Sequence, residues 1–310
     1  MAIKVLITGI LGQDGANMAE YLLSPTTSGS EDFKVYGMVR RSGSPNYKNI
    51  KSFASSPNFE LVDGDLSDGT SIDKLVKEIQ PDFFINFGAN SFVGVSWDMP
   101  LQVFDVNTLG VIRCLEAIKK FKPDCRFYSA GSSEEFGDVD YTPQDIEHPI
   151  KPRSPYGASK AAARHIVKVY RESYNLFAIH SILFNHEGVK RGEEFVTRKI
   201  TKGVARIKNA LDKGEKFEPL QLGNVNSRRD WSDSEDFVRG VWAMLNQSEP
   251  NEYVLSSNET HSVKEFVSEA FAAAGIPGLW SGEGMDEKFR LFQENTALAE
   301  INEKFYRPAE

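Results

Sequence analysis

The sequence predicts an α/β fold in which helices cover both faces of a doubly wound parallel sheet, followed by a smaller α/β lobe. Short apolar and β-branched runs alternate with longer stretches whose apolar residues have helical spacing. This alternation is typical of βαβ units, and strands buried on both faces read as continuous apolar runs. We expect strands at residues 3–9, 34–39, 59–64, 82–88, 126–131 and 177–184, and helices at 14–23, 72–79, 101–121 and 156–174.

The composition is that of an ordinary globular protein. Apolar residues make up 40% and charged residues 26% of the 310 residues, enough for one large or two ordinary domains. The net charge of −8 argues against a nucleic-acid or anionic-membrane binder, because both need broad positive potential. The two cysteines have no metal-ligand spacing, so we expect no metal and a reduced, cytoplasmic protein. The apolar start is too short for a membrane span and lacks a cationic leader, so no signal peptide is expected.

Three glycines follow the first expected strand and open the first expected helix. In the stretch TGILGQDG they are Gly9, Gly12 and Gly15. Glycines let the backbone turn tightly and approach a pyrophosphate, which then lies at the positive end of the helix dipole. The strand–turn–helix context favours a Rossmann-type dinucleotide site over a glycine-rich turn without a ligand.

Two arginines end the second expected strand. NAD-specific sites usually have a carboxylate at this place, bonded to the ribose 2′-hydroxyl. Arg40 and Arg41 stand there instead, and arginine matches a 2′-phosphate by charge and by its fork of donors. We therefore expect NADP, the alternative being two solvated surface arginines. Asp65 is expected near the adenine, and residues 86–91 near the middle of the cofactor.

A tyrosine and a lysine share one face of the helix expected at 156–174. Tyr156 and Lys160 are four residues apart, which places their side chains together. An ammonium beside a phenol stabilises the phenolate and lowers the pKa of the tyrosine, as a general base requires. The strand at 126–131 runs out at the carboxyl edge of the sheet, where ligands bind, and presents Ser132 and Glu134 there.

These residues resemble the extended short-chain dehydrogenase/reductase family and, within it, the GDP-mannose 4,6-dehydratases. The resemblance covers nearly the whole chain and keeps the order of the family's motifs. The matching stretches are TGILGQDG, VRRS, GDLSD, FYSAGSSEEFG, RSPYGASK, RESYNLFA, ILFNHEG, RGEEFVTRKI, LGNVNSRRDW, HSVKEFV and YRPAE.

The resemblance implies a dehydration of GDP-mannose to GDP-4-keto-6-deoxymannose and a role for each residue. Tyr156, beside Lys160, removes the proton from the sugar O4 while C4 passes hydride to NADP. Glu134 removes the C5 proton and helps expel the C6 hydroxyl as water, after which hydride returns to C6. Ser132 holds O4. The family usually has an apolar residue in place of Glu135, so we expect that side chain to face solvent as a local variation.

The resemblance also implies the binding residues. Ser133 favours a guanosine-linked substrate, because dehydratases of dTDP-glucose typically carry aspartate there. The expected cofactor-binding residues are Gly9, Gly12, Gln13, Asp14, Gly15, Arg40, Asp65, Leu66, Phe87, Gly88, Ala89, Ser91, Tyr156, Lys160, His186 and Arg191, the last two near the nicotinamide. The residues expected to hold GDP-mannose are Asn185, Lys199, Arg229, Arg307 and Glu310.

We expect an NADP-binding Rossmann domain at residues 1–185 and a mainly substrate-binding lobe at 186–310, with segments returning to the Rossmann sheet. After Asn185 the order of elements is looser, with more charge and more loop. The resemblance suggests a homotetramer, with a homodimer through two long helices as the minimum. Three alternatives stay open: a dehydratase of another nucleotide sugar, an epimerase, or a non-catalytic NADP-binding regulator.

Overall fold

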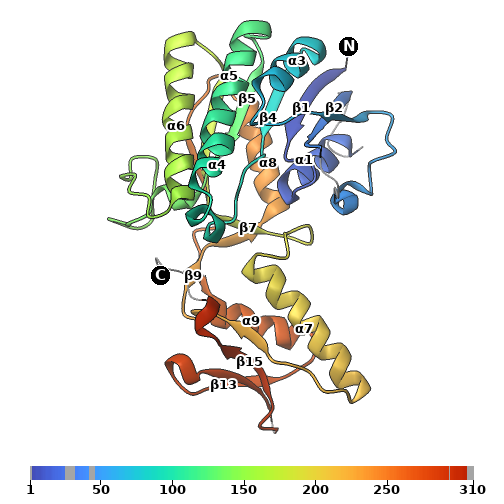
Figure 1. Ribbon diagram of the computed structural model, residues 1–310, viewed down its shortest axis with the longest axis vertical. Helices are drawn as coiled ribbons and strands as arrows, with labels where there is room; N and C mark the ends of the chain where they lie inside the picture. Colours follow the sequence, from blue (N-terminus) through green and yellow to red (C-terminus); the bar gives the residue numbers. More distant parts are fainter. Residues whose placement is uncertain (1, 25–31, 42–45, 293, 306–310) are drawn as a thin grey trace. The chain divides into compact units, whose positions relative to one another are not determined.

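The computed structural model describes residues 2–24, 32–41, 46–292 and 294–305 (Figure 1). The chain divides into two compact units. Unit 1 comprises residues 1–190 and 232–256, and unit 2 comprises residues 191–231 and 257–310. The boundary expected at residue 185 lies near the end of the first segment of unit 1. The assignment of one part to the cofactor and the other to the substrate stays a prediction.

Unit 1 is built on a seven-stranded parallel sheet with the strand order β11-β6-β5-β4-β1-β2-β3. Its strands are β1 (Ile3–Thr8), β2 (Phe33–Val39), β3 (Phe59–Asp63), β4 (Phe83–Asn86), β5 (Arg126–Ala130), β6 (Ala178–Leu183) and β11 (Tyr253–Leu255). The strand order reverses between β1 and β4, and ligands bind at the carboxyl ends of strands at such a switch point. The predicted α/β fold with a parallel sheet is confirmed.

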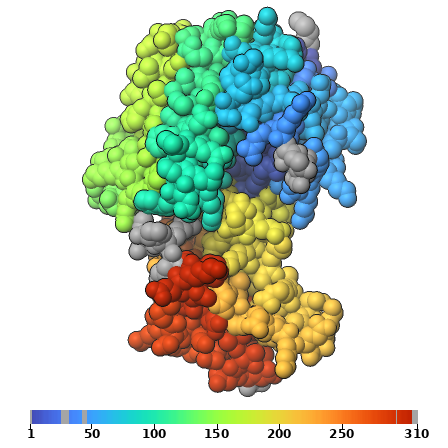
Figure 2. All heavy atoms as spheres, in the orientation of Figure 1, coloured from blue at the N-terminus to red at the C-terminus, as the bar shows by residue number. Residues whose placement is uncertain are grey.

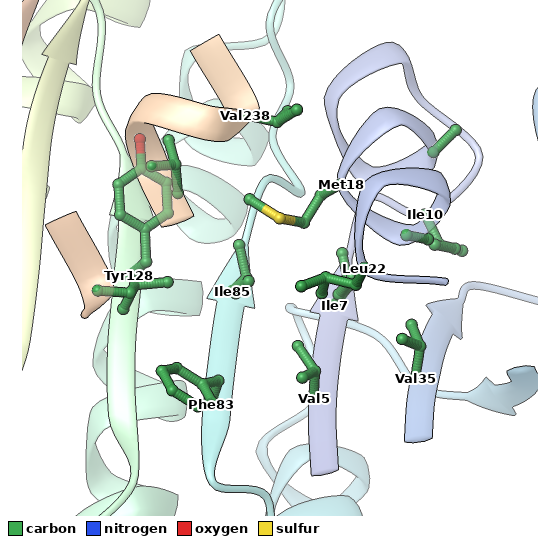
Figure 3. Close-up of a cluster of buried hydrophobic side chains, with 14 of the residues drawn as sticks. Val5, Ile7, Ile10, Met18, Leu22, Val35, Phe83, Ile85, Tyr128 and Val238 are labelled. Atoms are coloured by element: carbon green, nitrogen blue, oxygen red, sulfur yellow. The ribbon is translucent and has the colours of Figure 1, made fainter. Parts of the chain in front are cut away.

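Helices cover both faces of this sheet (Figure 1). One face carries α1 (Gln13–Leu23) and α8 (Ser234–Leu245), and the other carries α3 (Gly69–Ile79), α5 (Gly110–Phe121) and α6 (Pro155–Tyr174). Figure 3 shows the first face, where Met18 of α1 and Val238 of α8 lie over Ile7, Ile85 and Tyr128. These side chains are buried, so the apolar runs that predict the strands are the core itself.

The helix expected at residues 101–121 is continuous but irregular. It consists of α4 (Pro100–Phe104), one π-helical turn, η3 (Asp105–Leu109), and α5. The π turn changes the helical spacing by one residue, which a pattern of apolar positions does not reveal. The turn packs against α6, because the Thr108 hydroxyl donates to the carbonyl oxygen of Ser159 at 2.8 Å.

Unit 1 also contains short elements that connect the sheet to its helices. Two of them, η4 and β7, directly follow strands of the sheet. The short elements are η1 (Tyr47–Ile50), η2 (Gly94–Trp97), η4 (Ser133–Glu135) and β7 (Asn185–Glu187), which pairs with β10 (Trp231–Asp233).

Unit 2 has a core of its own, made by two helices and a four-stranded sheet. Its elements are α7 (Val196–Lys213), α9 (Val263–Ala273), the sheet β13 (Gly278–Ser281), β14 (Lys288–Leu291), β15 (Ala297–Ile301) and β8 (Leu220–Leu222), the pair β9 (Arg228–Arg229) and β12 (His261–Ser262), and the turns η5 (Gly284–Asp286) and η6 (Glu303–Phe305). The looser sequence pattern after Asn185 predicts none of the elements of this unit individually. Its strands are only two to five residues long, so their alternation is too brief to predict from sequence.

Within the residues that the structure describes, no helix is long and apolar enough to cross a membrane. The cellular location of the chain stays a prediction.

Candidate active site

The glycine turn after β1 approaches other backbone segments very closely. Gly9 has a φ of +67°, in the left-handed region that favours glycine. A Cβ atom on Gly9 would lie 2.8 Å from the amide nitrogen of Gly88, and one on Gly15 would lie 2.4 Å from the carbonyl oxygen of Gly9. The Gly12 amide donates to that same carbonyl at 2.9 Å. Side chains at these positions would collide with backbone, so only glycines permit this tight turn, the glycine cradle, at the start of α1.

The cradle fits a dinucleotide. Gly12 caps α1 without a side-chain hydrogen bond, so the first amides of the helix are available to a diphosphate. Gln13, the first residue of α1, is buried, and its Oε1 atom has no hydrogen-bond partner among the described residues. An unpaired buried acceptor is costly, and a donor on a bound ligand would satisfy it.

Both arginines at the end of β2 are exposed. The Arg41 guanidinium donates from Nε and Nη2 to Oδ2 of Asp63, both at 3.2 Å. Arg41 is therefore engaged by the carboxylate that ends β3. The binding of the cofactor by Arg40, which precedes it, stays a prediction.

The loop after β3 is held in place from both sides. Oδ1 of Asp65 accepts from the amide of Ser67 at 2.9 Å and from its hydroxyl at 2.7 Å. The carbonyl oxygen of Leu66 accepts from Arg113 of α5 at 2.8 Å. The structure therefore places Asp65 and Leu66 on a fixed loop at the carboxyl edge of the sheet.

The loop after β4 is tied to β1. The Gly88 amide donates to Oγ1 of Thr8 at 2.9 Å, and the Thr8 hydroxyl donates to Oδ1 of Asn86 at 2.5 Å. This loop therefore lies beside the glycine turn at the switch point. The other predicted cofactor-binding residues on it are Phe87, Ala89 and Ser91.

Residues at the start of α6 fix the positions of its tyrosine and lysine. The Ser154 hydroxyl caps the helix by accepting from the amide three residues later at 3.0 Å, and proline occupies the first helical position. Tyr156 and Lys160 then lie one turn apart and are both buried, with the lysine Nζ atom 6.0 Å from the centre of the tyrosine ring. Lys160 donates to the carbonyl oxygen of Ala130, the last residue of β5, at 2.7 Å.

The environment of Lys160 moves its titration toward neutral pH. Burial lowers the pKa of Lys160 to about 8, although the charges of Glu135 and Asp14 act in the opposite direction. A strongly shifted pKa in a buried lysine beside a tyrosine is characteristic of functional sites.

The turn after β5 packs directly against the start of α6. Ser132 precedes this turn, and its Oγ atom accepts from the Glu134 amide at 3.3 Å. A Cβ atom on Gly157 would lie 2.4 Å from the carbonyl oxygen of Glu134, so only glycine permits this approach. Since Gly157 follows Tyr156, the structure brings Ser132 and Glu134 beside the tyrosine–lysine pair. The catalytic roles of these four residues stay predictions.

The expectation that Glu135 faces solvent is wrong, because this side chain is completely buried. Its Oε1 atom accepts from the Ser132 amide at 2.9 Å and lies 2.9 Å from Nε2 of His180. The tight turn directs its third residue back under the sheet edge, where His180 of β6 supplies a partner. No nearby residue in the sequence reveals that partner.

His186 lies beside the first turn of α1. Its Nε2 atom is 3.0 Å from Oδ2 of Asp14, and its ring stacks on Phe237 with the ring centres 4.5 Å apart. Gln13 also donates to the backbone carbonyl of His186 at 3.0 Å. The structure thus joins β7, which begins at Asn185, to the glycine turn. The contact of His186 with a nicotinamide stays a prediction.

Two of the predicted arginines belong to unit 2. The Arg191 guanidinium lies over the ring of Phe195, 3.6 Å from its centre. Arg229 is part of β9, and its Nη1 atom donates to the carbonyl oxygen of the preceding residue at 2.8 Å. Both residues are held within unit 2, and their contacts with ligands stay predictions.

Lys199 of α7 is the predicted lysine of unit 2. Its ammonium lies 3.4 Å from the centre of the Phe305 ring, and partial burial lowers the pKa of Lys199. Because this amine is already partly removed from water, binding an anionic ligand would cost it less further dehydration. An ammonium on an aromatic ring can still donate to such a ligand. Arg307 and Glu310, the other two predicted substrate ligands of this unit, lie outside the described residues.

Sequence reasoning missed Asn107, which connects the loop after β4 to α6. From the π turn, its Oδ1 atom accepts from the Asn90 amide at 2.8 Å, and its Nδ2 atom donates to the hydroxyl of Ser159 at 3.1 Å. The sequence signal was an asparagine beside apolar residues within an expected helix. Asn107 is buried, and buried amide groups are usually held by hydrogen-bond partners.

The described ranges contain no group of three or more histidine, cysteine, aspartate or glutamate side chains that could hold a metal ion. The groups of the site are instead the buried amine of Lys160 and phenol of Tyr156 and the half-buried hydroxyl of Ser132 and carboxylate of Glu134, which suit proton transfer.

Comparisons with known proteins agree with this arrangement. The family model described as GDP-mannose 4,6 dehydratase matches residues 6–310. The GDP-mannose 4,6 dehydratase of Homo sapiens is 40% identical over 313 residues, which span 98% of this chain and 81% of the relative. The GDP-mannose 4,6-dehydratase of Yersinia enterocolitica is 40% identical over 324 residues, with 99% and 84% covered.

Solved structures show the same fold. A dTDP-glucose 4,6-dehydratase from Bacillus anthracis in complex with NAD superposes with a TM-score of 0.75 at 26% identity, covering 88% of this chain and 81% of that one. A UDP-glucose 4-epimerase from Thermus thermophilus has a TM-score of 0.75 at 22% identity, with 99% and 88% covered. The family model and the two relatives identify this chain as a member of the GDP-mannose 4,6-dehydratase family.

Proposed function

We propose that this protein removes one water from GDP-mannose and yields GDP-4-keto-6-deoxymannose. The observation that carries the proposal is the turn of Ser132 and Glu134, packed against the start of α6 beside Tyr156 and Lys160. A carboxylate at this place supplies what dehydration needs beyond the chemistry of a simple dehydrogenase. Membership of the family supports the same reaction.

The reaction needs a base at O4 and an acid/base at C5 and C6. The chemistry that a bound nicotinamide dinucleotide supplies is reversible storage of one hydride, taken from C4 of the sugar and returned at C6. Tyr156 accepts the O4 proton, and the Lys160 ammonium stabilises the phenolate that precedes this step. Ser132 donates a hydrogen bond to O4 and orients it.

Glu134 performs the elimination. A ketone at C4 acidifies the proton on C5, which Glu134 removes as the C6–O bond breaks. The same carboxyl then gives a proton to the departing hydroxyl, so that water leaves. Hydride then adds to C6, and C5 takes up one proton, which balances the proton that Tyr156 accepted from O4. The sum is the loss of one water without net oxidation, so no external reductant is needed.

We assign NADP as the dinucleotide. The support is that two arginines, and no carboxylate, follow β2. Asp63 engages Arg41, so we assign the 2′-phosphate to Arg40. An exposed guanidinium can bind a 2′-phosphate through two parallel hydrogen bonds. The dehydratase from Bacillus anthracis was solved with NAD, so the choice between the two cofactors needs a direct binding measurement.

Cationic residues of unit 2 are assigned to the substrate diphosphate. Lys199 and Arg229 are separated in sequence but belong to the same compact unit. A diphosphate needs two or three cationic partners, and a carboxylate accepts paired hydrogen bonds from a guanine edge. Asn185 of β7, together with Arg307 and Glu310, completes the assigned set.

We further propose a homodimer or homotetramer. Large apolar side chains are exposed along α4 and η3, most of all Leu101 at 87% exposure, with Phe104 and Leu109 beside it in sequence. Figure 2 shows this green segment on the visible surface of unit 1. Exposed apolar groups of this size favour contact with a second copy. Sedimentation equilibrium would measure the oligomeric state, and a monomer at micromolar concentration would contradict the proposal.

Incubation with GDP-mannose, with and without added NADP, tests the function. Mass spectrometry should detect a nucleotide sugar lighter by one water. If GDP-mannose is untouched but a dTDP- or UDP-sugar loses water, the mechanism holds and the substrate is wrong. If a sugar is only epimerised, Glu134 has no role in elimination. If the protein binds NADP and converts no nucleotide sugar, it is a regulator.

A further inference from the structure

Glu135 and His180 form a completely buried polar pair below the proposed active site. Neither side chain has any exposure, and they are joined by the contact of 2.9 Å between Oε1 and Nε2. A carboxylate only accepts hydrogen bonds, so Nε2 of His180 carries the proton in this contact. An apolar pair would fill the same space without the cost of dehydrating a charge, so packing alone does not explain these two residues.

The backbone is shaped around the pair. A Cβ atom on Gly131 would lie 2.3 Å from Nε2 of His180 and 2.5 Å from Oε1 of Glu135. The second carboxylate oxygen, Oε2, and the second ring nitrogen, Nδ1, have no hydrogen-bond partner within the described part of the chain. The pair is therefore only partly hydrogen-bonded, and at a buried place the field of a charge reaches its neighbours with little screening.

One neighbour is the turn that carries Ser132 and Glu134. The turn has a capping box, in which Oε1 of Glu135 accepts from the Ser132 amide and the Ser132 side chain accepts from the Glu135 amide. Oγ of Ser132 also accepts from the Glu134 amide. The orientation of both proposed catalytic side chains thus depends on where Glu135 is held.

The other neighbour is Lys160, whose ammonium donates to the carbonyl oxygen of the residue before Gly131. The Glu135 charge opposes the effect of burial on this amine. The other titratable or charged groups that face the pair or the lysine are Asp14 of α1, Tyr128 of β5, Tyr156 and Arg164 of α6, and Glu252 before β11.

We propose that Glu135, held by His180, is a positioning residue that fixes the turn of Ser132 and Glu134 and acts electrostatically on Lys160, which donates to the residue before Gly131. The first half rests on the proposed function. The second half concerns the charge of Lys160 alone and holds for the protein without substrate or cofactor.

The test follows the titration of Lys160 by NMR in protein whose lysines carry carbon-13 at Cε. The signal is assigned by its loss in Lys160→Arg. In Glu135→Gln, which keeps the shape and an acceptor for the Ser132 amide, the midpoint should fall by about one pH unit, because a negative charge that stabilises the ammonium is gone. The double variant Glu135→Leu/His180→Leu removes both polar side chains of the pair, at the cost of the acceptor of the Ser132 amide. It should give the same fall, so it replaces the single variant if that one does not fold.

The matched control is Ser181→Ala. Ser181 follows His180 on β6 and shares a buried hydrogen bond of 2.7 Å with the Tyr128 hydroxyl, so its loss weakens the same core without changing any charge. The control should lower the melting temperature and leave the Lys160 midpoint unchanged. An unchanged midpoint in Glu135→Gln, or an equal shift in the control, would overturn the proposal.

Turnover gives a second readout. In Glu135→Gln, the midpoint of the alkaline limb in the pH profile of kcat should fall by as many pH units as the Lys160 midpoint does. KM for GDP-mannose should be unchanged. Wild-type protein that converts no GDP-mannose would contradict the proposed function and leave the NMR test of Lys160 intact. Active wild type with an unmoved limb in the variant would contradict the inference and leave the function intact.

Discussion

Two turns at the carboxyl edge of the same sheet are built in opposite ways. The turn after β1 is shaped by missing side chains, because Gly9 and Gly15 approach backbone at distances that a Cβ atom would not allow. The turn after β5 is shaped by side chains, because Glu135 holds it through Ser132 on one side and His180 on the other. The first lets backbone segments come close together, as a pyrophosphate site requires, whereas the second positions side chains that carry chemical groups.

The difference shows which kind of site a sequence reveals. The glycine turn lies within a few residues of its strand and helix, so its pattern is complete in TGILGQDG. The catalytic turn depends on His180, which is 45 positions away from Glu135. The contact between Glu135 and His180 is therefore known only once β5 is paired with β6.

The largest expected effect comes from breaking the glycine turn. Gly9→Ala adds a Cβ that meets the backbone of residue 88 and strains a φ of +67°, so the affinity for NADP should fall by more than about 100-fold. Titration calorimetry measures this. The control is Gly214→Ala, since Gly214 has a φ of +68° with no atom within 4 Å of the added Cβ. Equal affinities of Gly9→Ala and wild type would contradict the cradle.

A smaller loss should follow from Gly157→Ala, which pushes the Glu134 carbonyl away from α6. A displacement of about 1 Å can cost about 100-fold in rate, so kcat should fall by about 10- to 100-fold while NADP affinity is kept. Gly69→Ala is the control, because its Cβ meets only the Arg113 side chain at 3.8 Å or more. Steady-state kinetics with unchanged kcat in Gly157→Ala would show that the approach of the turn to the helix does not matter.

The substitution Arg40→Glu tests whether Arg40 binds the 2′-phosphate of the cofactor. A carboxylate in place of Arg40 repels a 2′-phosphate, so the preference for NADP over NAD should fall by about 10- to 100-fold. The matched variant Arg41→Glu removes the arginine that Asp63 already engages and should have a weaker effect. If Arg41→Glu changes the ratio of the two dissociation constants more than Arg40→Glu, the assignments of the two arginines are reversed.

The smallest effect concerns the support of the catalytic helix. Burial alone would raise the pKa of Glu252, but the hydrogen bond from Arg164 of α6 and neighbouring positive charges outweigh it and lower the pKa. A lowered pKa stabilises the folded state above the unfolded pKa, and this contribution disappears as pH falls through the folded pKa. Glu252→Gln should therefore lose about 1–3 kcal/mol near pH 7 and less in acid. Denaturant melts at both pH values test this, and a loss that grows in acid would contradict it.

The prediction of the fold succeeded where signals were local. Apolar runs predicted the strands of unit 1, and the spacing of Tyr156 and Lys160 predicted a shared helical face. The π turn at 105–109 was missed because apolar spacing does not show one extra residue. The burial of Glu135 was missed because its partner is remote, and a glutamate without a visible partner is expected in solvent.

The most direct test of the account is a single incubation of Glu134→Gln with GDP-mannose and NADP. We predict that C4 is still oxidised, so the absorbance of the reduced nicotinamide accumulates, while no product lighter by one water forms. Glutamine keeps the shape of the turn but does not remove the C5 proton. Water loss at the wild-type rate in Glu134→Gln would contradict the assignment of this carboxylate to the elimination.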